Sequence, residues 1–165
     1  MAQSDPNTAP FHWQGRHDAE DGELGKRVHH VIKNISVEEL PIRSEGVSIL
    51  GFATDAGVAR NKGRIGAKKS PDLIRRALAN LAWHQDAPLY DLGTVVCEDD
   101  LLESSQSQCA ATVAQALPHS PVVVLGGGHE PKAGPGSFND LCESSLGREA
   151  FGGLEIFGGE PMILP

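Results

Sequence analysis

Apolar residues follow two alternating patterns along this chain. Short stretches rich in apolar and β-branched residues occur at 46–53, 88–96 and 122–125, a length typical of strands that are buried on both faces of a sheet. Between them, in 70–83 and 99–117, apolar residues recur every three or four positions, which predicts amphipathic helices. Strands that alternate with helices predict a parallel sheet with right-handed crossovers, and therefore an α/β fold.

The segment 70–83 carries the clearest helix signals. Ser70 is placed to cap the first turn, and Pro71 suits the first helical position because its fixed φ matches a helix. The apolar residues of this segment predict one buried stripe, formed by Leu73, Ile74, Ala77, Leu78 and Leu81. In the helix predicted at 99–117, we expect the polar run ESSQSQ to face solvent.

The chain divides into three parts. Residues 1–25 are polar and interrupted by Pro and Gly, so we expect an irregular N-terminal arm whose aromatic anchor lies in FHWQGR. Residues 26–130 hold the elements of one partial α/β domain, including a short amphipathic helix expected at 26–40. In residues 131–165, Gly and Pro become about twice as frequent, which predicts an irregular tail.

Length, charge and cysteine spacing exclude several classes of protein. A chain of 165 residues is long enough for one domain, and its net charge of −8 argues against binding to nucleic acid. No apolar run approaches the roughly 18–20 residues that cross a bilayer, and the N-terminus does not resemble a secretory signal. We therefore expect a cytoplasmic protein without a membrane partner. Cys97, Cys109 and Cys142 lack the close spacing of zinc sites, so reduced structural thiols are expected.

Two loops leave predicted strands at their carboxyl ends, where open α/β sheets bind ligands. One contains TDAGVARNKGR, the other is GGGHE at 126–130, and we expect them to share a pocket. The glycines allow a sharp turn that brings His129 to the strand end, where an imidazole suits metal binding or general-base chemistry. A turn histidine without a ligand is the simpler alternative. A phosphate site is disfavoured because GxGxxG and P-loop spacings are absent.

The same stretches resemble a known family. WQGRHD, LGFATDAGVARNKGRIGAKKSPDLIRRALANLA and VVVLGGGHE together are similar to the N-terminal part of the formimidoylglutamase branch of the arginase and agmatinase (ureohydrolase) superfamily. The resemblance runs from Trp13 to Glu130 and is lost after it. The superfamily's opening motif is matched by the spacing of Asp55, Gly57, Arg60, Gly63, Arg64, Gly66, Pro71 and Arg75. GGGHE, in place of GGDHS, resembles the formimidoylglutamase form of the metal loop.

The resemblance implies an incomplete three-layer α/β/α fold with a mostly parallel sheet, and possible assembly into a homo-oligomer. It also implies a binuclear Mn²⁺ site whose bridging hydroxide splits N-formimidoyl-L-glutamate into L-glutamate and formamide in histidine degradation. His129 matches a metal ligand of the family.

Other residues of the resembling stretch have candidate roles. Arg60, Asn61 and Arg64 are candidates to bind the substrate's carboxylates, with loop solvation or a subunit interface as alternatives. Asp55 is expected to brace its loop by local hydrogen bonds.

Part of the family's pattern is missing. Its later Asp-Ala-His-x-Asp and Asp-x-Asp ligand patterns do not occur in this chain. One imidazole cannot hold two Mn²⁺ ions, because such cations want about six mainly oxygen ligands. We therefore expect the chain to be inactive by itself. A truncated or frame-shifted, non-catalytic remnant is one alternative, and another ureohydrolase such as agmatinase or arginase is a second, which GGGHE and WQGR disfavour.

Overall fold

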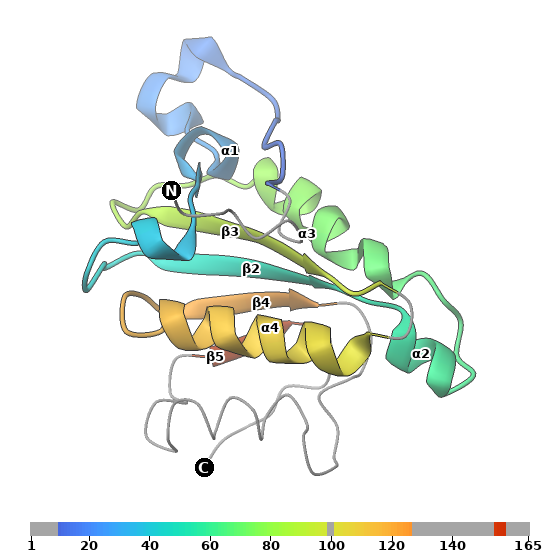
Figure 1. The fold of residues 1–165 in the computed structure, drawn as a ribbon. Coiled ribbons are helices and arrows are strands. Elements are labelled where there is room, and N and C mark those ends of the chain that lie inside the picture. The colour runs from blue at the N-terminus through green and yellow to red at the C-terminus, as the bar shows by residue number, and fades with distance from the viewer. Residues whose placement is uncertain (1–9, 99–100, 127–153, 158–165) are drawn as a thin grey trace, which may run out of the picture.

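The computed structural model describes residues 10–98, 101–126 and 154–157, which form a parallel sheet with helices on both faces (Figure 1). The strands lie in the order β1-β3-β2-β4-β5, and every neighbouring pair is parallel. They are β1 (Lys33–Asn34), β2 (Val47–Ala53), β3 (Leu89–Val96), β4 (Val122–Gly126) and β5 (Leu154–Phe157). This sheet confirms the expected α/β fold. β5 adds a short strand to a segment that we expected to be irregular.

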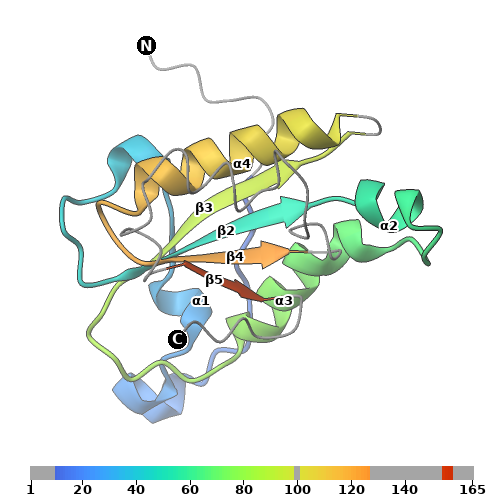
Figure 2. The same ribbon diagram turned by 90° about the horizontal axis from the view of Figure 1, so that it is seen from below.

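The two long helices lie on opposite faces of the sheet. α3 (Ser70–Ala79) connects β2 to its neighbour β3, and α4 (Leu102–Ala116) then leads from β3 to β4, on the other side of β2. Right-handed crossovers that run in opposite directions place their helices on opposite faces, so the chain forms three layers, α/β/α (Figure 2). The layered architecture implied by the family resemblance is confirmed.

The face of the sheet under α4 is apolar. Fully buried residues of β2, β3, β4 and α4 meet there, namely Leu50, Val95, Val122, Cys109 and Val113. The buried side of α4 also includes Ser105 and Gln106, so the expectation that ESSQSQ faces solvent is wrong for these two residues. Ser105 remains satisfied there because its hydroxyl donates to the carbonyl of Leu101, 2.9 Å away.

The face of the sheet under α3 contains a buried charge. Arg75 is 0% exposed, whereas Leu73 and Leu81 of the predicted apolar stripe are 57% and 55% exposed. The residues of α3 that are buried are Pro71, Arg75 and Ala79. The predicted stripe is therefore only partly right: Ile74 and Leu78 are half-buried, but Leu73, Ala77 and Leu81 are exposed. The fully buried position is Arg75, because Asp91 of β3 offers its guanidinium a buried partner that spacing cannot reveal.

The segment 26–40 does not form the single helix that its spacing predicted. It contains α1 (Val28–Val31), strand β1 and the 3-10 helix η2 (Val37–Glu39). The helix stops at Ile32, whose φ of −69° and ψ of 138° are extended, so that β1 can pair with β3. Pairing with the sheet edge outweighs the helical spacing here, since β-branched residues also favour extended backbone. The cap predicted at Ser70 is likewise wrong, because Ser70 is already the first residue of α3.

The described part of the N-terminal arm is anchored by aromatic residues. The indole N–H of Trp13 donates to the Asp91 carboxylate at 2.8 Å, and its ring meets Phe11 edge-on with centroids 5.2 Å apart. The predicted anchor is confirmed, although the arm also contains short 3-10 turns, η1 (Ala19–Gly25), which are interrupted by a kink at Gly22 with a φ of 52°. In the described residues, no helix is long and apolar enough to cross a membrane.

Candidate functional site

The candidate site lies at the carboxyl ends of β2 and β4. These strands are neighbours, and Phe52 near the end of β2 pairs with Gly126 at the end of β4. The chain leaves β2 toward α3 on one face and reaches β4 from α4 on the other (Figure 2). Such a switch point is where open α/β sheets bind ligands. His129 follows Gly126 closely in the sequence but lies outside the described residues, so its role stays a prediction.

The loop that leaves β2 is held by the carboxylate of Asp55. Its Oδ1 accepts hydrogen bonds from the backbone N–H groups of Gly66 and Lys68, at 2.9 and 3.0 Å. These bonds, that of Gly66 first, hold the pKa of Asp55 below its usual value because they stabilise the ionised carboxylate. The expectation that Asp55 braces the loop is confirmed. The brace draws together the two ends of the segment that holds α2 (Ala56–Arg60).

Two positive φ angles shape the tip of this loop. Lys62 has a φ of 54° and Gly66 a φ of 134°. The left-handed region is uncommon for a residue with a side chain, whereas glycine enters it without a steric penalty. The turn at Lys62 ends α2 and leaves the neighbouring side chains of Asn61 and Arg64 exposed.

Arg60 is held by an acidic residue of α4. Its Nη1 lies 2.6 Å from Glu103 Oε1, and its Nη2 lies 3.3 Å from Oε2. The hydrogen bond from Arg60 is the main reason that the pKa of Glu103 lies below its usual value. The pair is exposed and joins α2 to α4. Arg60, Asn61 and Arg64 thus share one surface loop beside the strand ends, and their role toward a substrate stays a prediction.

The described residues do not fit a binuclear metal centre. Among them, no group of three or more His, Cys, Asp or Glu side chains is arranged to hold a metal ion. Asp55 is engaged by backbone N–H groups, and Glu103 is engaged by Arg60. Hard divalent cations need several oxygen ligands at once. The family's metal would therefore need ligands beyond this part of the chain.

A buried ion pair joins α3 to β3, the strand next to β2. Arg75 Nε and Nη2 donate to the two carboxylate oxygens of Asp91, at 2.9 and 2.8 Å, and both side chains are 0% exposed. The remaining donors are also used: Nη1 binds Thr94 Oγ1 at 2.7 Å, and Nη2 binds the Gly93 carbonyl at 2.6 Å. A buried ion pair is tolerated when its other polar atoms find partners, as they do here.

This ion pair holds an irregularity in β3. Ile49 of β2 pairs with Asp91, but Gly51 pairs with Thr94, so β3 has one extra residue between these pairs. Gly93 lies in the bulge with a φ of 85°, and its N–H donates to Asp91 Oδ1 at 2.9 Å. Bulges re-aim the residues that follow them. The Arg75 network thereby sets the direction of the carboxyl end of β3.

A groove of about 610 Å³ lies between α3, the arm and the carboxyl ends of β2 and β3. Polar residues from the arm, the 3-10 turn η3 (Ala67–Lys69), α3 and β3 line it, including His12, Gln14, Lys68, Asp72, Arg76 and Thr94. This groove could not be predicted from the sequence, because its walls come from segments that lie far apart along the chain.

Comparison with known proteins assigns these features to a family. The sequence model of the arginase family matches residues 45–136, more than half of the chain, and this range includes both strand-end loops. The chain belongs to the arginase family. The match runs on past Glu130, to residue 136.

Several relatives that this chain resembles are formimidoylglutamases. One from Vibrio parahaemolyticus is 71% identical over 143 residues, which are 87% of this chain and 42% of the relative. One from Vibrio cholerae is 58% identical over 126 residues, 76% of this chain and 38% of the relative. The crystal structure of oxidized Trypanosoma cruzi formiminoglutamase with Mn²⁺ matches with a TM-score of 0.51 and 27% identity, over 69% of this chain and 39% of that chain. The chain spans less than half the length of each of these relatives.

Proposed function

We propose that this chain carries part of a cytoplasmic formimidoylglutamase, which hydrolyses N-formimidoyl-L-glutamate to L-glutamate and formamide with Mn²⁺. The observation that carries the proposal is the 71% identity to a formimidoylglutamase over 87% of the chain. The adjacent carboxyl ends of β2 and β4 support it, because the two loops of the family's pattern begin there, at one edge of the sheet.

His129 is the Mn²⁺ ligand that we propose for this chain. Among the described residues, no three or more His, Cys, Asp or Glu side chains are grouped so that they could hold a metal ion, and the Asp-Ala-His-x-Asp and Asp-x-Asp patterns are absent from the sequence. Several oxygen ligands are required for each such ion. We therefore propose that the chain does not turn over the substrate by itself.

The loop after β2 is the proposed contact for the substrate's carboxylates. Asn61 and Arg64 are exposed on it, and the Asp55 brace fixes where the loop lies. Arg60 would have to exchange its Glu103 partner for a substrate carboxylate, which makes it the weaker candidate of the three. Arg64 can present two parallel N–H groups to a carboxylate, and it does not first have to give up a contact with Glu103.

A chimera tests the proposed function separately from the missing ligands. Residues 13–130 of this chain replace the matching segment of the Vibrio parahaemolyticus formimidoylglutamase, and formamide release is measured with Mn²⁺. We expect the chimera to hydrolyse N-formimidoyl-L-glutamate and the isolated chain not to do so. His129→Ala should abolish the activity of the chimera. A folded chimera that is inactive, or one that hydrolyses agmatine or arginine instead, would contradict the proposal.

A non-catalytic role is the second candidate, favoured by the lack of a metal-binding group in the described residues. In that case the chimera would fold but release no formamide, and His129→Ala would change nothing that can be measured. Manganese-dependent turnover by the isolated chain would exclude this alternative.

A further inference from the structure

The helix α3 presents a buried, a polar and an apolar surface. The residues that pack against the sheet are Pro71, Arg75 and Ala79. On one side of them lies an exposed polar row, made of Asp72, Arg76 and Asn80. The rest of the helix is apolar, with Ile74 and Leu78 half-buried and Leu73 and Ala77 exposed. These four residues form one continuous surface, the apolar flank of α3, because residues three and four apart are neighbours on a helix.

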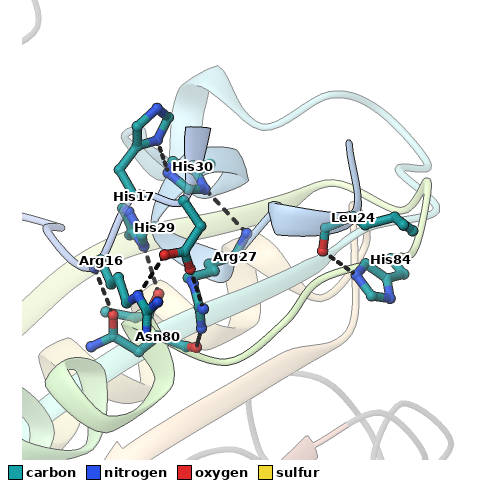
Figure 3. A network of polar contacts seen from close by, with 10 residues as sticks. Arg16, His17, Leu24, Arg27, His29, His30, Asn80 and His84 are labelled. Carbon is teal, nitrogen blue, oxygen red and sulfur yellow. Dashed lines mark hydrogen bonds and ion pairs between the residues drawn. The ribbon is translucent and has the colours of Figure 1, made fainter. Parts of the chain in front are cut away.

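The polar row of α3 faces the arm and β3. Its three residues line the groove beside the arm, together with Thr94 and Val96 of β3. At the end of the helix, Asn80 accepts two hydrogen bonds, one at Oδ1 from the Arg16 N–H at 2.8 Å and one at its carbonyl from Arg27 Nη1 at 2.6 Å (Figure 3). Because β3 and β4 lie on opposite sides of β2, the apolar flank faces the β4 side of the sheet.

The sheet surface next to the apolar flank is apolar as well. α3 packs on both β2 and β4. In β4, Val122 and Val124 belong to the cluster under α4, so the alternation of side chains along a strand places Val123 and Leu125 on the α3 face. Leu125 is buried there, but Val123 is half-buried. Exposed apolar surface therefore extends from the apolar flank onto β4.

The apolar flank has the character of a contact surface. Single exposed apolar side chains are common on soluble proteins, whereas several adjoining ones mark a site that another surface covers. Leu73 is 57% exposed and lies beside Ala77. In a layered α/β domain, the helices of one layer pack side by side over the sheet. Within the described ranges, α3 has the arm and the start of α1 beside its polar row, and nothing that buries its apolar flank.

The size of the apolar flank disfavours a second copy of this chain as its occupant. A helix of 10 residues is about 15 Å long, so two such flanks alone fall far short of the roughly 800 Å² per partner that a stable association buries. The occupant must therefore hold further surface of the chain at the same time, as a continuation of the same domain does.

The relatives indicate where such a continuation comes from. The formimidoylglutamase from Vibrio parahaemolyticus matches 87% of this chain at 71% identity, but the match covers 42% of the relative. More than half of the relative therefore lies outside the match. This chain resembles the N-terminal part of the family, so most of the unmatched length follows the matched segment. It is long enough to supply further helices for the α3 face.

We propose that the apolar flank of α3 is the docking face for the part of a formimidoylglutamase that follows the matched segment, and that the apolar side of a helix from that part packs on it. This inference rests on the proposed function, because it takes the rest of that enzyme as the occupant. The contact buries Leu73 and Ala77 and completes the helical layer on the α3 face.

Thiol labelling tests the docking face in the full 165-residue chain and in the chimera that joins residues 13–130 to the Vibrio parahaemolyticus enzyme. Ala77→Cys places a thiol on the apolar flank with little change in volume. Asp72→Cys is the matched control, because Asp72 lies on the polar row of the same helix and is 56% exposed. Modification by a maleimide is followed for each labelled peptide by mass spectrometry.

We expect both thiols to react at similar rates in the isolated chain. In the chimera, the Ala77→Cys thiol should react at least about tenfold more slowly than the Asp72→Cys thiol, because a covered residue reacts only when its cover opens. The comparison within the chimera decides the matter even if the isolated chain is unfolded, and Leu73→Cys is the second variant if Ala77→Cys does not fold.

Equal rates for the two thiols in the folded chimera would overturn the proposal. Slow labelling of Ala77→Cys in the folded isolated chain would also overturn it: the occupant is a second copy if the protection depends on concentration, and a segment of this chain if it does not. Formamide release by the unsubstituted chimera is measured separately. Protection without turnover would contradict the proposed function alone, and turnover without protection would contradict the docking face alone.

Discussion

The two faces of the central sheet are held by different physical forces. Under α4, apolar side chains from three strands bury their surface against the helix, whereas under α3 a charged network joins Arg75 to Asp91 and Thr94. Neighbouring residues of β2 show the contrast. Leu50 packs into the apolar face, but a Cβ on Gly51 would lie 2.5 Å from Thr94 Oγ1 and 2.8 Å from Arg75 Nη1. Hydrophobic burial is non-directional, so the face under α4 can accept different apolar side chains. Hydrogen bonds are directional, so the network under α3 fixes one geometry and leaves room only for glycine at residue 51.

The largest expected effect comes from breaking the buried ion pair. Asp91→Ala leaves the Arg75 guanidinium buried without its carboxylate, and we expect a loss of about 3–5 kcal/mol in the free energy of unfolding. Urea unfolding followed by circular dichroism measures it.

Two further variants control for this result. Asp72→Ala removes a carboxylate that also lies near Arg75, at 3.7 Å, but is 56% exposed, so little change is expected. The double variant Arg75→Leu, Asp91→Leu should lose less than Asp91→Ala, because no charge remains buried. Equal losses for Asp91→Ala and Asp72→Ala would show that the α3 face does not depend on the pair.

The apolar face should respond to a cavity. Leu50→Ala removes a fully buried side chain from the cluster under α4, and we expect a loss of about 3 kcal/mol in the free energy of unfolding. Denaturant unfolding with an unchanged slope would attribute the loss to the folded state. A loss below about 1 kcal/mol would mean that the cluster relaxes into the cavity, contrary to a close-packed face.

The polar face should respond to added volume at the next residue. Gly51→Ala introduces a methyl group against Thr94 and Arg75, and we expect a loss of about 1–3 kcal/mol from strain in the network. A neutral Gly51→Ala would show that the Arg75 network shifts freely, which would remove the contrast between the two faces.

The smallest expected effect concerns Asp55, a carboxylate held by backbone donors at the strand ends. Its pKa lies below the usual value of 3.8, so its contribution to stability is present above that pH and is lost as the pH falls through the lower folded value. The amide NMR signals of Gly66 and Lys68 should titrate together with a midpoint below 3.8. Their titration should be absent in Asp55→Asn, and a midpoint above 3.8 would contradict the brace.

The apolar part of this fold could be predicted from the sequence. The strands β2, β3 and β4 and both long helices lie where apolar runs and helical spacing indicated. The α3 face could not be predicted in the same way. An arginine in a helix is expected to face solvent, and the local sequence does not show that Asp91 of β3 is the partner of Arg75. The helix expected at 26–40 failed for a related reason, since pairing with the edge of β3 is a non-local effect.

Of the candidate site, only the positions of its two loops could be predicted from the sequence. The pairing of Phe52 with Gly126 confirms that the two expected loops start at adjacent strand ends. The Asp55 brace was expected from its place after a strand, whereas the Arg60–Glu103 pair and the groove join distant segments that carry no local signal. His129 was found through a resemblance and a glycine-rich turn, and its role stays a prediction.

The amount of manganese bound by the purified chain shows whether the chain holds a complete metal site. The chain is equilibrated with Mn²⁺, unbound metal is removed, and the metal content per chain is measured for the unmodified protein and for His129→Ala. We expect clearly less than the roughly two ions of a two-metal site, and any residual binding should be lost in His129→Ala. About two Mn²⁺ per chain in the unmodified protein would contradict this expectation.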